Sequence, residues 1–266
     1  MKEVKPDWYK RIWTLDIKQM SWVEETGRQV DFLVREMGLN GSERILDLAC
    51  GFGRHSIALA KRGFRVVGVD ITPDYISDAV KTAKSEGVEA TFICSDIRDI
   101  RFDAEFDVVL NMADGAIGYL ENEQENLKIF DRIAAALKPG GKHFMDICNR
   151  EHAESCFPKR HWEVGSSSVS LAEFSWNSES KRMLYGGFEL PFGKVAQPPA
   201  EICPHSCTRL YHKQELADIL AQRGMKLLKT WSDYDGSPDS FKQMQLMVYS
   251  RKSLASCKNR ISQPIL

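Results

Sequence analysis

Short apolar runs alternate along the chain with segments in which apolar residues recur every three or four positions. The first strong run, residues 45–49, has the composition of a strand that is buried on both faces. Comparable runs predict further strands at residues 65–70, 90–94, 106–111, 142–148, 226–234 and 243–250. Helical spacing predicts helices at residues 24–37, 56–62, 72–86, 123–137 and 212–222. Such alternation is typical of an α/β fold with a doubly wound, mostly parallel sheet.

The helix expected at residues 72–86 has the clearest start signal. Thr72 offers a capping hydroxyl, Pro73 suits the first helical position, and Asp74 places an acid in the first turn. Gly87 then marks the end of this helix. We therefore expect a well-defined helix between the second and third strands.

Two segments depart from the alternation. Residues 156–208 carry apolar side chains in roughly alternating positions, punctuated by Gly, Ser, Asn and Pro, and predict antiparallel strands laid as a lid over the sheet's carboxyl rim. Residues 1–23 predict one or two short helices with four large aromatic side chains, namely Trp8, Tyr9, Trp13 and Trp22. These aromatics suit either a cap that packs on the core or a lid that closes over a ligand. We expect a single domain at residues 1–251 and a flexible tail at residues 252–266.

A glycine-rich junction joins the first strand to the helix that follows it. Gly51 and Gly53 free the backbone to turn sharply and allow a ligand to approach without a Cβ in the way. Ligands in open α/β sheets bind beyond the carboxyl ends of the strands. The sequence therefore predicts a small-molecule site at this turn.

Polar side chains stand at or just after the ends of four successive predicted strands. These residues are Asp47, Asp70, Asp96 and Asn111. A single acid at such a place is often only a turn residue, but several on one rim beside a Gly-x-Gly turn are hard to explain by packing. This arrangement favours a ligand site that extends along the rim.

Five motifs together resemble the class I S-adenosylmethionine-dependent methyltransferases of the small-molecule type. The stretch Asp47-Leu48-Ala49-Cys50-Gly51-Phe52-Gly53 is similar to that family's Asp-x-x-x-Gly-x-Gly signature. The other four motifs, in the family's order, are Val69-Asp70, Ser95-Asp96-Ile97, Asn111-Met112 and Leu137-Lys138-Pro139-Gly140-Gly141. The resemblance covers residues 24–150 closely and residues 209–251 well. It implies a Rossmann-like sheet of seven strands with an antiparallel seventh, and S-adenosylmethionine as the cofactor.

The resemblance also implies which residues bind the cofactor. They are Asp47, Gly51, Gly53, Arg54, Asp70, Ile71, Asp96, Ile97, Asn111 and Met112. Asp70 is expected at the ribose, because an ionised carboxylate can accept hydrogen bonds from both hydroxyls. Asp96 and the Ile97 amide are expected at the adenine, with Ile71 and Ile97 on its two faces.

Two residues near the glycine turn each have two roles to choose between under the same resemblance. Asp47 is expected to orient the glycine loop or the ligand's ammonium group. Arg54 suits either a partner for the methionine carboxylate or a surface residue at the helix start. Both interpretations of Arg54 stay open.

The expected activity is methyl transfer from S-adenosylmethionine to a small-molecule acceptor with a nitrogen or oxygen nucleophile, by in-line displacement. The insertion after the fifth strand resembles that of enzymes acting on small molecules, including amino-sugar N-methyltransferases. The residues predicted to contact the acceptor are Tyr9, Asp114, Arg150, Arg209, Tyr211 and Tyr234. Tyr119 as a hydrogen-bond donor and His205 as an acceptor-side base are the catalytic candidates, although Tyr119 also suits packing under the lid.

Other functions remain as alternatives. They are a protein or RNA methyltransferase, a non-catalytic S-adenosylmethionine-binding protein, and a dinucleotide-dependent oxidoreductase. The dinucleotide fingerprint requires a third glycine where this chain has Ser56. The segment Cys203-Pro204-His205-Ser206-Cys207 suggests zinc, but the spacing lacks a second Cys-x-x-Cys pair, so no metal is expected.

Composition adds limits on partners and location. A formal net charge of −1 gives no overall field that favours nucleic acid or an anionic membrane. No apolar stretch approaches the roughly 20 residues of a membrane helix. The chain has seven cysteines, several of them in predicted core strands, which indicates reduced thiols and a cytoplasmic location. We expect a monomer or homodimer whose partner is the small-molecule acceptor.

Overall fold

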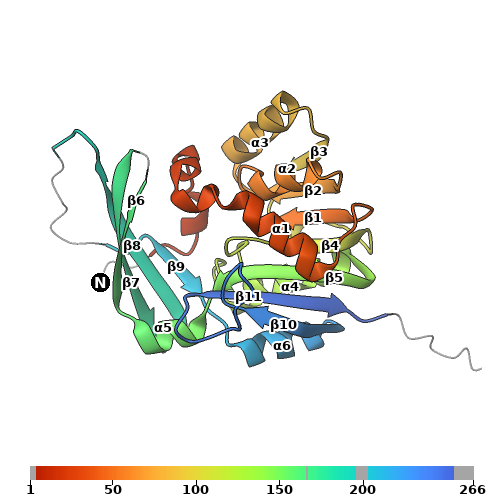
Figure 1. Ribbon diagram of the computed structural model, residues 1–266. Coiled ribbons are helices and arrows are strands. Elements are labelled where there is room, and N and C mark those ends of the chain that lie inside the picture. Colours follow the sequence, from red (N-terminus) through yellow and green to blue (C-terminus); the bar gives the residue numbers. More distant parts are fainter. Residues whose placement is uncertain (1–3, 166, 196–202, 255–266) are drawn as a thin grey trace, which may run out of the picture.

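The computed structural model describes residues 4–165, 167–195 and 203–254, which form two β-sheets (Figure 1). The larger sheet has the strand order β10-β11-β5-β4-β1-β2-β3. Its strands are β1 (Arg44–Leu48), β2 (Arg65–Asp70), β3 (Ala90–Cys94), β4 (Phe106–Asn111), β5 (Leu137–Cys148), β10 (Met225–Trp231) and β11 (Gln245–Lys252). The last strand, β11, runs antiparallel to both β5 and β10, whereas β1 to β5 pair in parallel. The predicted doubly wound sheet with an antiparallel seventh strand is confirmed.

Helices cover both faces of the larger sheet. They are α1 (Thr26–Met37), α2 (Arg54–Ala60), α3 (Pro73–Ser85), α4 (Glu123–Ala136) and α6 (Lys213–Ala221). The short helix α5 (Arg150–Cys156) packs instead against the smaller sheet, where Ala153 lies in a buried cluster with Met183. α1 and α2 cover one face, where Phe32 lies in a buried cluster with Ile45 of β1. α4 and α6 cover the other face, where Phe130 and Leu220 lie with Leu46. Because successive side chains of a strand point to opposite faces, Ile45 and Leu46 join different clusters. Among the described residues, no helix has the length and hydropathy needed to cross a bilayer.

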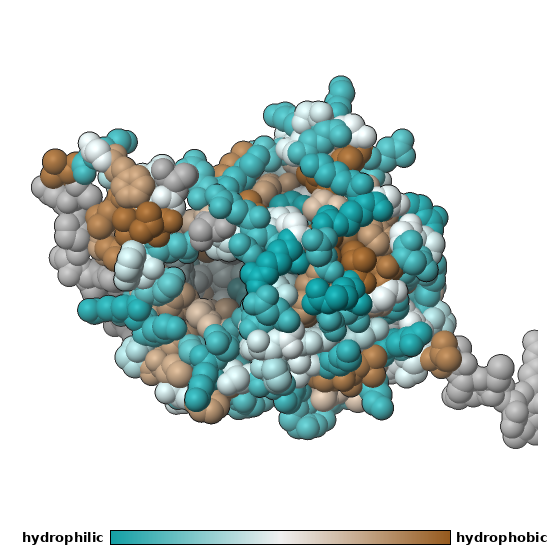
Figure 2. All heavy atoms as spheres, viewed as in Figure 1, coloured by the Kyte–Doolittle hydropathy of each residue, from teal (hydrophilic) through white to brown (hydrophobic). Residues whose placement is uncertain are grey.

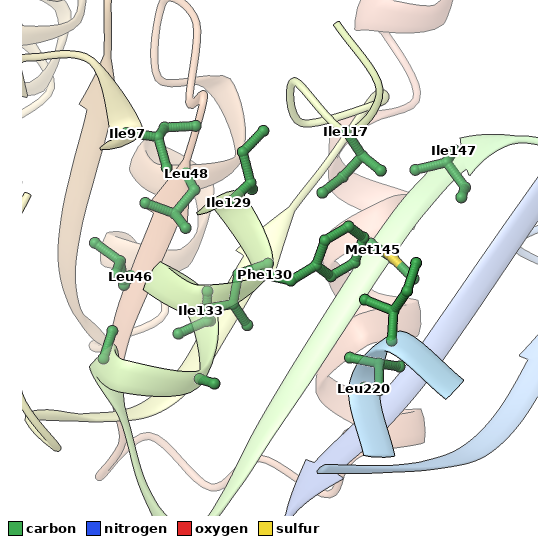
Figure 3. Close-up of a cluster of buried hydrophobic side chains, with 14 of the residues drawn as sticks. Leu46, Leu48, Ile97, Ile117, Ile129, Phe130, Ile133, Met145, Ile147 and Leu220 are labelled. Carbon is green, nitrogen blue, oxygen red and sulfur yellow. The ribbon is translucent and has the colours of Figure 1, made fainter. Parts of the chain in front are cut away.

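The cluster under α4 fixes the strands that carry the site (Figure 3). Leu46 and Leu48 of β1 lie opposite Phe130 and Ile133 of α4, with Met145 of β5 beside them. All five side chains are completely buried. Burial of one such side chain contributes roughly 1.5–3 kcal/mol. The cluster therefore fixes the position of the end of β1 relative to the end of β5.

The smaller sheet is antiparallel throughout and stands apart from the larger one (Figure 1). Its strands are β6 (Lys159–Val164), β7 (Ser168–Asn177), β8 (Arg182–Pro191) and β9 (Ser206–Arg209). Three 3-10 helices of the N-terminal segment lie between the two sheets in Figure 1, namely η1 (Trp8–Lys10), η2 (Leu15–Gln19) and η3 (Ser21–Val23). The sequence predicted the antiparallel insertion, but expected one or two N-terminal helices where the structure has three.

Some local predictions differ from the structure. Thr72 precedes α3 without a side-chain capping bond, because its hydroxyl interacts with the Asp70 carboxylate instead. The helix α5 was missed, since seven residues are too few to show helical periodicity; its start is capped by Asn149, which accepts from the Glu151 amide.

The C-terminal predictions also need correction. β10 ends at Trp231, three residues earlier than predicted, because the Ser232 amide donates to the Ser237 carbonyl in a turn. Lys252, predicted to begin the tail, still belongs to β11. Residues 255–266 of the predicted tail lie outside the described residues.

The smaller sheet is joined to the larger one by a close backbone contact. The Arg209 amide at the end of β9 donates to the Gly118 carbonyl at 2.8 Å. Gly118 has a φ of +83°, and a Cβ built there would lie 2.0 Å from the Arg209 carbonyl oxygen. The Arg209 side chain then pairs with Glu123 and Glu215 of α4 and α6. Position 118 therefore needs glycine both for its backbone conformation and for space.

Replacing Gly118 with alanine should lower the free energy of unfolding by about 2–4 kcal/mol, because a strained left-handed residue and a displaced β9 each cost energy. Urea unfolding followed by circular dichroism measures this loss. Gly27→Ala is the matched control, since a Cβ at that α1 position meets nothing within 4 Å and alanine favours helix. Equal stability of Gly118→Ala and wild type would contradict the role of the Gly118–Arg209 contact in joining the smaller sheet to the larger one.

Candidate active site

A cavity of about 1190 Å³ lies between the carboxyl rim of the larger sheet, the N-terminal 3-10 helices and the smaller sheet. Figure 2 shows the molecular surface hollowed between the two sheets. Trp8 and Tyr9 line this cavity and are also buried in the main core cluster. The two interpretations of the N-terminal aromatics are therefore compatible, because these side chains pack on the core and border the ligand space at once.

The turn after β1 is held by Asp70 at the end of β2. The Gly51 amide donates to Asp70 Oδ2 at 2.9 Å, and the Thr72 amide donates to Oδ1 at 2.8 Å. Gly51 has a φ of +57°, and a Cβ there would meet only the Tyr75 ring, at 3.9 Å. Burial raises the pKa of Asp70. The carboxylate can still accept from a ligand hydroxyl, and open space lies above the turn.

Asp47 lies beneath the same turn and is 1% exposed. Ser56 Oγ donates to Asp47 Oδ2 at 2.6 Å, whereas Oδ1 has no hydrogen-bond partner among the described residues. Desolvation raises the pKa of Asp47 to about 6. A buried carboxylate oxygen that lines a cavity and lacks a donor is a place where a ligand cation or N–H group is stabilised.

Arg54 at the start of α2 also lines the cavity and is not a surface residue. Its guanidinium donates to Thr26 Oγ1 at 2.8 Å and to Gln29 Oε1 at 2.7 Å. It lies over the Trp22 ring, 4.8 Å from the centroid. These contacts hold a cation at the glycine turn in a fixed orientation, which favours the interpretation as a partner for a ligand carboxylate.

Asp96, Ile71 and Ile97 line the part of the cavity beyond β2 and β3. Arg98 donates to both carboxylate oxygens of Asp96 at 2.6–3.1 Å. Burial alone would raise the pKa of Asp96, but the bonds to Arg98 outweigh it and lower that pKa. The Asp96 carboxylate therefore shares its lone pairs with Arg98, which the sequence did not predict. Arg98 also donates to Tyr9 Oη at 3.2 Å and so ties the N-terminal segment to this rim.

The segment after β4 makes an uncommon left-handed turn. Ala113, Asp114, Gly115 and Ala116 all have positive φ, between 51° and 68°. Each non-glycine residue in this conformation costs roughly 1–2 kcal/mol. The turn is held by Asn111, whose Nδ2 donates to the Gly115 carbonyl at 2.8 Å. The surrounding structure thus maintains local strain that aims Asp114 at the cavity.

Asp114 and Asp146 form an acidic pair at the ends of β4 and β5. Tyr119 Oη donates to Asp114 at 3.1 Å, and the Cys148 amide donates to its other oxygen at 3.1 Å. Tyr234 Oη donates to Asp146 at 2.6 Å and Gln245 Nε2 donates at 2.8 Å. Desolvation raises the pKa of both acids, that of Asp146 to about 6. The Asp114 charge further raises the pKa of Asp146.

The smaller sheet supplies the opposite wall. Phe174, Met183, Tyr185 and His205 of this sheet and its connections line the cavity. The His205 ring packs edge-on against Tyr185, with centroids 5.0 Å apart. Desolvation lowers the pKa of His205, which keeps its imidazole neutral near pH 7 and able to accept a proton.

Two predicted cofactor residues lie away from the cavity. Asn111 is completely buried and serves the left-handed turn. Gly53 begins α2 with a φ of +78°, and a Cβ there would approach Phe92 at 2.8 Å. Neither lines the cavity among the described residues, and their contact with a cofactor stays a prediction.

Three residues predicted to contact the acceptor also lie outside the lining of the cavity. Arg150 pairs with Glu154 at 2.9 Å, and Arg209 pairs with Glu215. Tyr211 is completely buried in the core. Within the described part of the chain none of the three lines the cavity, because all three pack where β9, α5 and α6 meet. Tyr234 is not among the described residues that line the cavity, but its hydroxyl donates to Asp146, which does line it.

The remaining predicted residues do line the cavity. They are Tyr9, Asp47, Gly51, Arg54, Asp70, Ile71, Asp96, Ile97, Met112, Asp114, Tyr119 and His205. Sequence reasoning missed Asp146, although an acid inside the apolar run Phe144–Ile147 is a usable signal. It also missed the aromatic wall of the insertion, because a two-residue period does not show which face of a strand meets a ligand. In the described ranges no group of three or more His, Cys, Asp or Glu is arranged to hold a metal ion.

Comparison with known proteins connects this geometry with one class of proteins. Residues 45–141 match the family described as "Methyltransferase domain". The putative methyltransferase YqeM of Bacillus subtilis (strain 168) is 27% identical over 237 residues, which cover 82% of this chain and 87% of that protein. Three further curated methyltransferases match over 40% to 50% of their own length.

Solved structures share the fold over most of the chain. An S-adenosylmethionine-dependent methyltransferase from Clostridium acetobutylicum ATCC 824 has a TM-score of 0.70 at 16% identity, covering 89% of this chain and 96% of that one. The CcbJ methyltransferase from Streptomyces caelestis has a TM-score of 0.71 at 15% identity, covering 86% and 95%. At such identities the likeness establishes the fold.

The buried acids predict how stability depends on pH. The pKa of Asp47 in the folded state, about 6, lies above its ordinary value of 3.8. The folded state therefore retains a proton that the unfolded state releases as the pH rises from about 4 to about 6, and the free energy of unfolding falls over that range. At pH 7, Asp47→Asn should stabilise the ligand-free protein by about 1–3 kcal/mol.

Urea unfolding at pH 5 and pH 7 checks this prediction. The exposed Asp103→Asn is the matched control and should leave both values unchanged. If Asp47→Asn were less stable than wild type at pH 7, or kept the wild-type pH dependence, the buried charge of Asp47 would not be what lowers the free energy of unfolding.

Proposed function

The chain is a class I S-adenosylmethionine-dependent methyltransferase, and from this premise we propose that it methylates a small-molecule acceptor at a nitrogen or oxygen atom. One observation carries the proposal: a single cavity runs from the glycine turn after β1 to the inner wall of the smaller sheet. Its volume of about 1190 Å³ exceeds the roughly 300–1,000 Å³ typical of one drug-sized ligand. Such a space suits a methyl donor and a small acceptor side by side.

The residues at the glycine turn fit S-adenosylmethionine. Gly51 leaves open space where a Cβ would otherwise approach the ligand. The unpartnered Oδ1 of Asp47 suits an ammonium group, and the fixed guanidinium of Arg54 suits a carboxylate. Asp70 can accept from ribose hydroxyls while it retains the Gly51 and Thr72 amides. Ile71 and Ile97 offer apolar surface to a purine.

The protein's contribution to the chemistry is placement and exclusion of water. When bound, S-adenosylmethionine supplies a methyl group made electrophilic by a sulfonium. Bringing the two reactants together in line removes much of the entropic barrier, and an effective molarity on the order of 10⁵–10⁸ M is attainable in this way. The N-terminal helices and the smaller sheet cover the cavity and would shield the reacting atoms.

Two side chains support proton handling on the acceptor side. Burial raises the pKa of Tyr119 far above its ordinary value, so its hydroxyl stays protonated and acts as a donor. The neutral His205 imidazole lines the opposite wall and is available as a base. Tyr9 borders the same space, but its hydroxyl already donates to Glu121 at 2.9 Å, which suits packing against an acceptor.

The competing functions have less support. A protein or RNA acceptor would need a wide entrance, whereas two covering segments border this cavity. RNA would also require basic surface at the site, and the net charge of −1 offers no such excess.

A cytoplasmic location remains part of the proposal, supported by the free thiols of the described cysteines.

Asp70→Ala should weaken S-adenosylhomocysteine binding about 100-fold, because hydrogen bonds to a charged group contribute roughly 1.5–3 kcal/mol each. Titration calorimetry measures the dissociation constant directly. Asp74→Ala removes an exposed acid four positions away and serves as the control, with wild-type affinity expected. Wild-type affinity in Asp70→Ala would overturn the assignment of the cofactor site.

A further inference from the structure

The cavity carries far more acids than cations. Among the described residues that line it, eight are aspartate or glutamate, whereas only Arg54 and Lys194 carry a permanent positive charge. The Arg54 guanidinium is held at the glycine turn by Thr26 and Gln29. Low-dielectric walls focus such a field, so the part of the cavity away from Arg54 attracts cations and repels anions.

Three aromatic rings gather next to one of these acids. The Trp8 ring lies 4.8 Å from the Tyr119 ring, and the Trp13 ring stacks on Tyr119 at 6.0 Å. All three residues line the cavity, and Tyr119 Oη donates to Asp114. Aromatic faces beside a carboxylate are the arrangement that proteins use to bind ammonium groups.

Asp114 and Asp146 are held by hydrogen bonds from uncharged groups of the described chain. Within the described ranges, no lysine or arginine forms an ion pair with Asp114 or Asp146; their hydrogen bonds come from Tyr119, Tyr234, Gln245 and the Cys148 amide. Asp47 lines the same cavity with one oxygen unpartnered. Like charges in one desolvated site repel each other. A bound cation would offset this repulsion, which no ion pair within the described residues offsets.

We propose that the methyl acceptor is a small amine, that Trp8, Trp13 and Tyr119 receive its ammonium form, and that Asp114 binds this ammonium and takes its proton. The proposal deepens the methyltransferase function stated above and rests on it. It selects a nitrogen acceptor over an oxygen acceptor, and it assigns the role of base to Asp114 in place of His205.

The step balances as follows. The ammonium transfers one proton to the Asp114 carboxylate, which leaves a neutral amine with a free electron pair. That pair forms a bond to the methyl carbon while the carbon–sulfur bond breaks, and the bonding electrons remain on sulfur as S-adenosylhomocysteine. The product leaves as the methylated ammonium, and the proton on Asp114 returns to solvent.

The surroundings of Asp114 suit this role. Tyr119 faces it from the same loop, Asp146 and Cys148 face it from β5, and Asp146 is in turn near Tyr234 and Arg54. Burial raises the pKa of Asp114, which makes its carboxylate a stronger base than an exposed one. Tyr119 stays protonated and supports the carboxylate as a donor.

Binding measurements distinguish the amine proposal from the more general proposal of a methyltransferase. With saturating S-adenosylhomocysteine, titration calorimetry of the wild type should show that 2-phenylethylamine binds more than tenfold tighter than 2-phenylethanol at pH 7. Asp114→Asn should bring the two affinities within about threefold and leave S-adenosylhomocysteine binding unchanged. Asp16→Asn, which removes an exposed acid from the cavity rim, should keep the preference.

The contrary outcomes are distinct. Equal or tighter binding of the alcohol, no measurable binding of the amine to wild type, or a preference that survives in Asp114→Asn would each overturn the amine proposal. Loss of S-adenosylhomocysteine binding by the wild type would instead contradict the proposed function itself.

A kinetic test addresses the base. In a labelled-methyl screen of matched primary amines and alcohols, the label should appear on nitrogen, and Asp114→Asn should lower kcat/KM by about 10²–10⁴-fold. The slope of log kcat/KM against pH below neutrality should flatten in that variant, an effect that a purely structural role would not produce. Methylation confined to hydroxyl groups, or an unchanged pH profile, would contradict the assignment.

Discussion

Uncompensated negative charge, buried along the carboxyl rim of the larger sheet, is the constraint around which the structure is built. Asp47, Asp70 and Asp146 lie on β1, β2 and β5, and Asp114 lies in the turn after β4, the strand between β5 and β1. Burial raises the pKa of each. Backbone amides and hydroxyl groups stabilise them in place of lysine or arginine partners. Such groups reduce the stability of the empty protein and are retained where a positively charged ligand stabilises them.

The rest of the fold keeps these acids in position. The buried cluster under α4 aligns β1 with β5, and Asn111 maintains the strained turn that carries Asp114. The contact between Gly118 and Arg209 fixes the smaller sheet against that same turn. The covering wall and the acidic rim therefore form one unit, so a change in the joint would alter the shape of the acceptor space as well as the stability.

The sequence predicted the sheet and its antiparallel last strand, and most of the residues that it proposed for the cofactor line the cavity. Those features depend on local signals, namely apolar runs, a Gly-x-Gly turn and acids at strand ends, which the sequence displays directly. A smaller share of the residues proposed for the acceptor lines the cavity. Arg150 and Tyr211 are close in sequence to the insertion but serve its attachment to the core. Asp146 was missed, although its place in an apolar run was a usable signal, because its partner Asp114 is 32 residues away in the chain and comes close only when β4 and β5 pair.

A crystal structure of the complex with S-adenosylhomocysteine tests the central claim most directly. The account predicts that the ribose hydroxyls bind Asp70, that the ammonium lies near the free oxygen of Asp47, and that the sulfur faces the space bounded by Met112, Asp114 and Tyr119. A ligand bound outside this cavity, or a sulfur directed away from Asp114, would contradict the account.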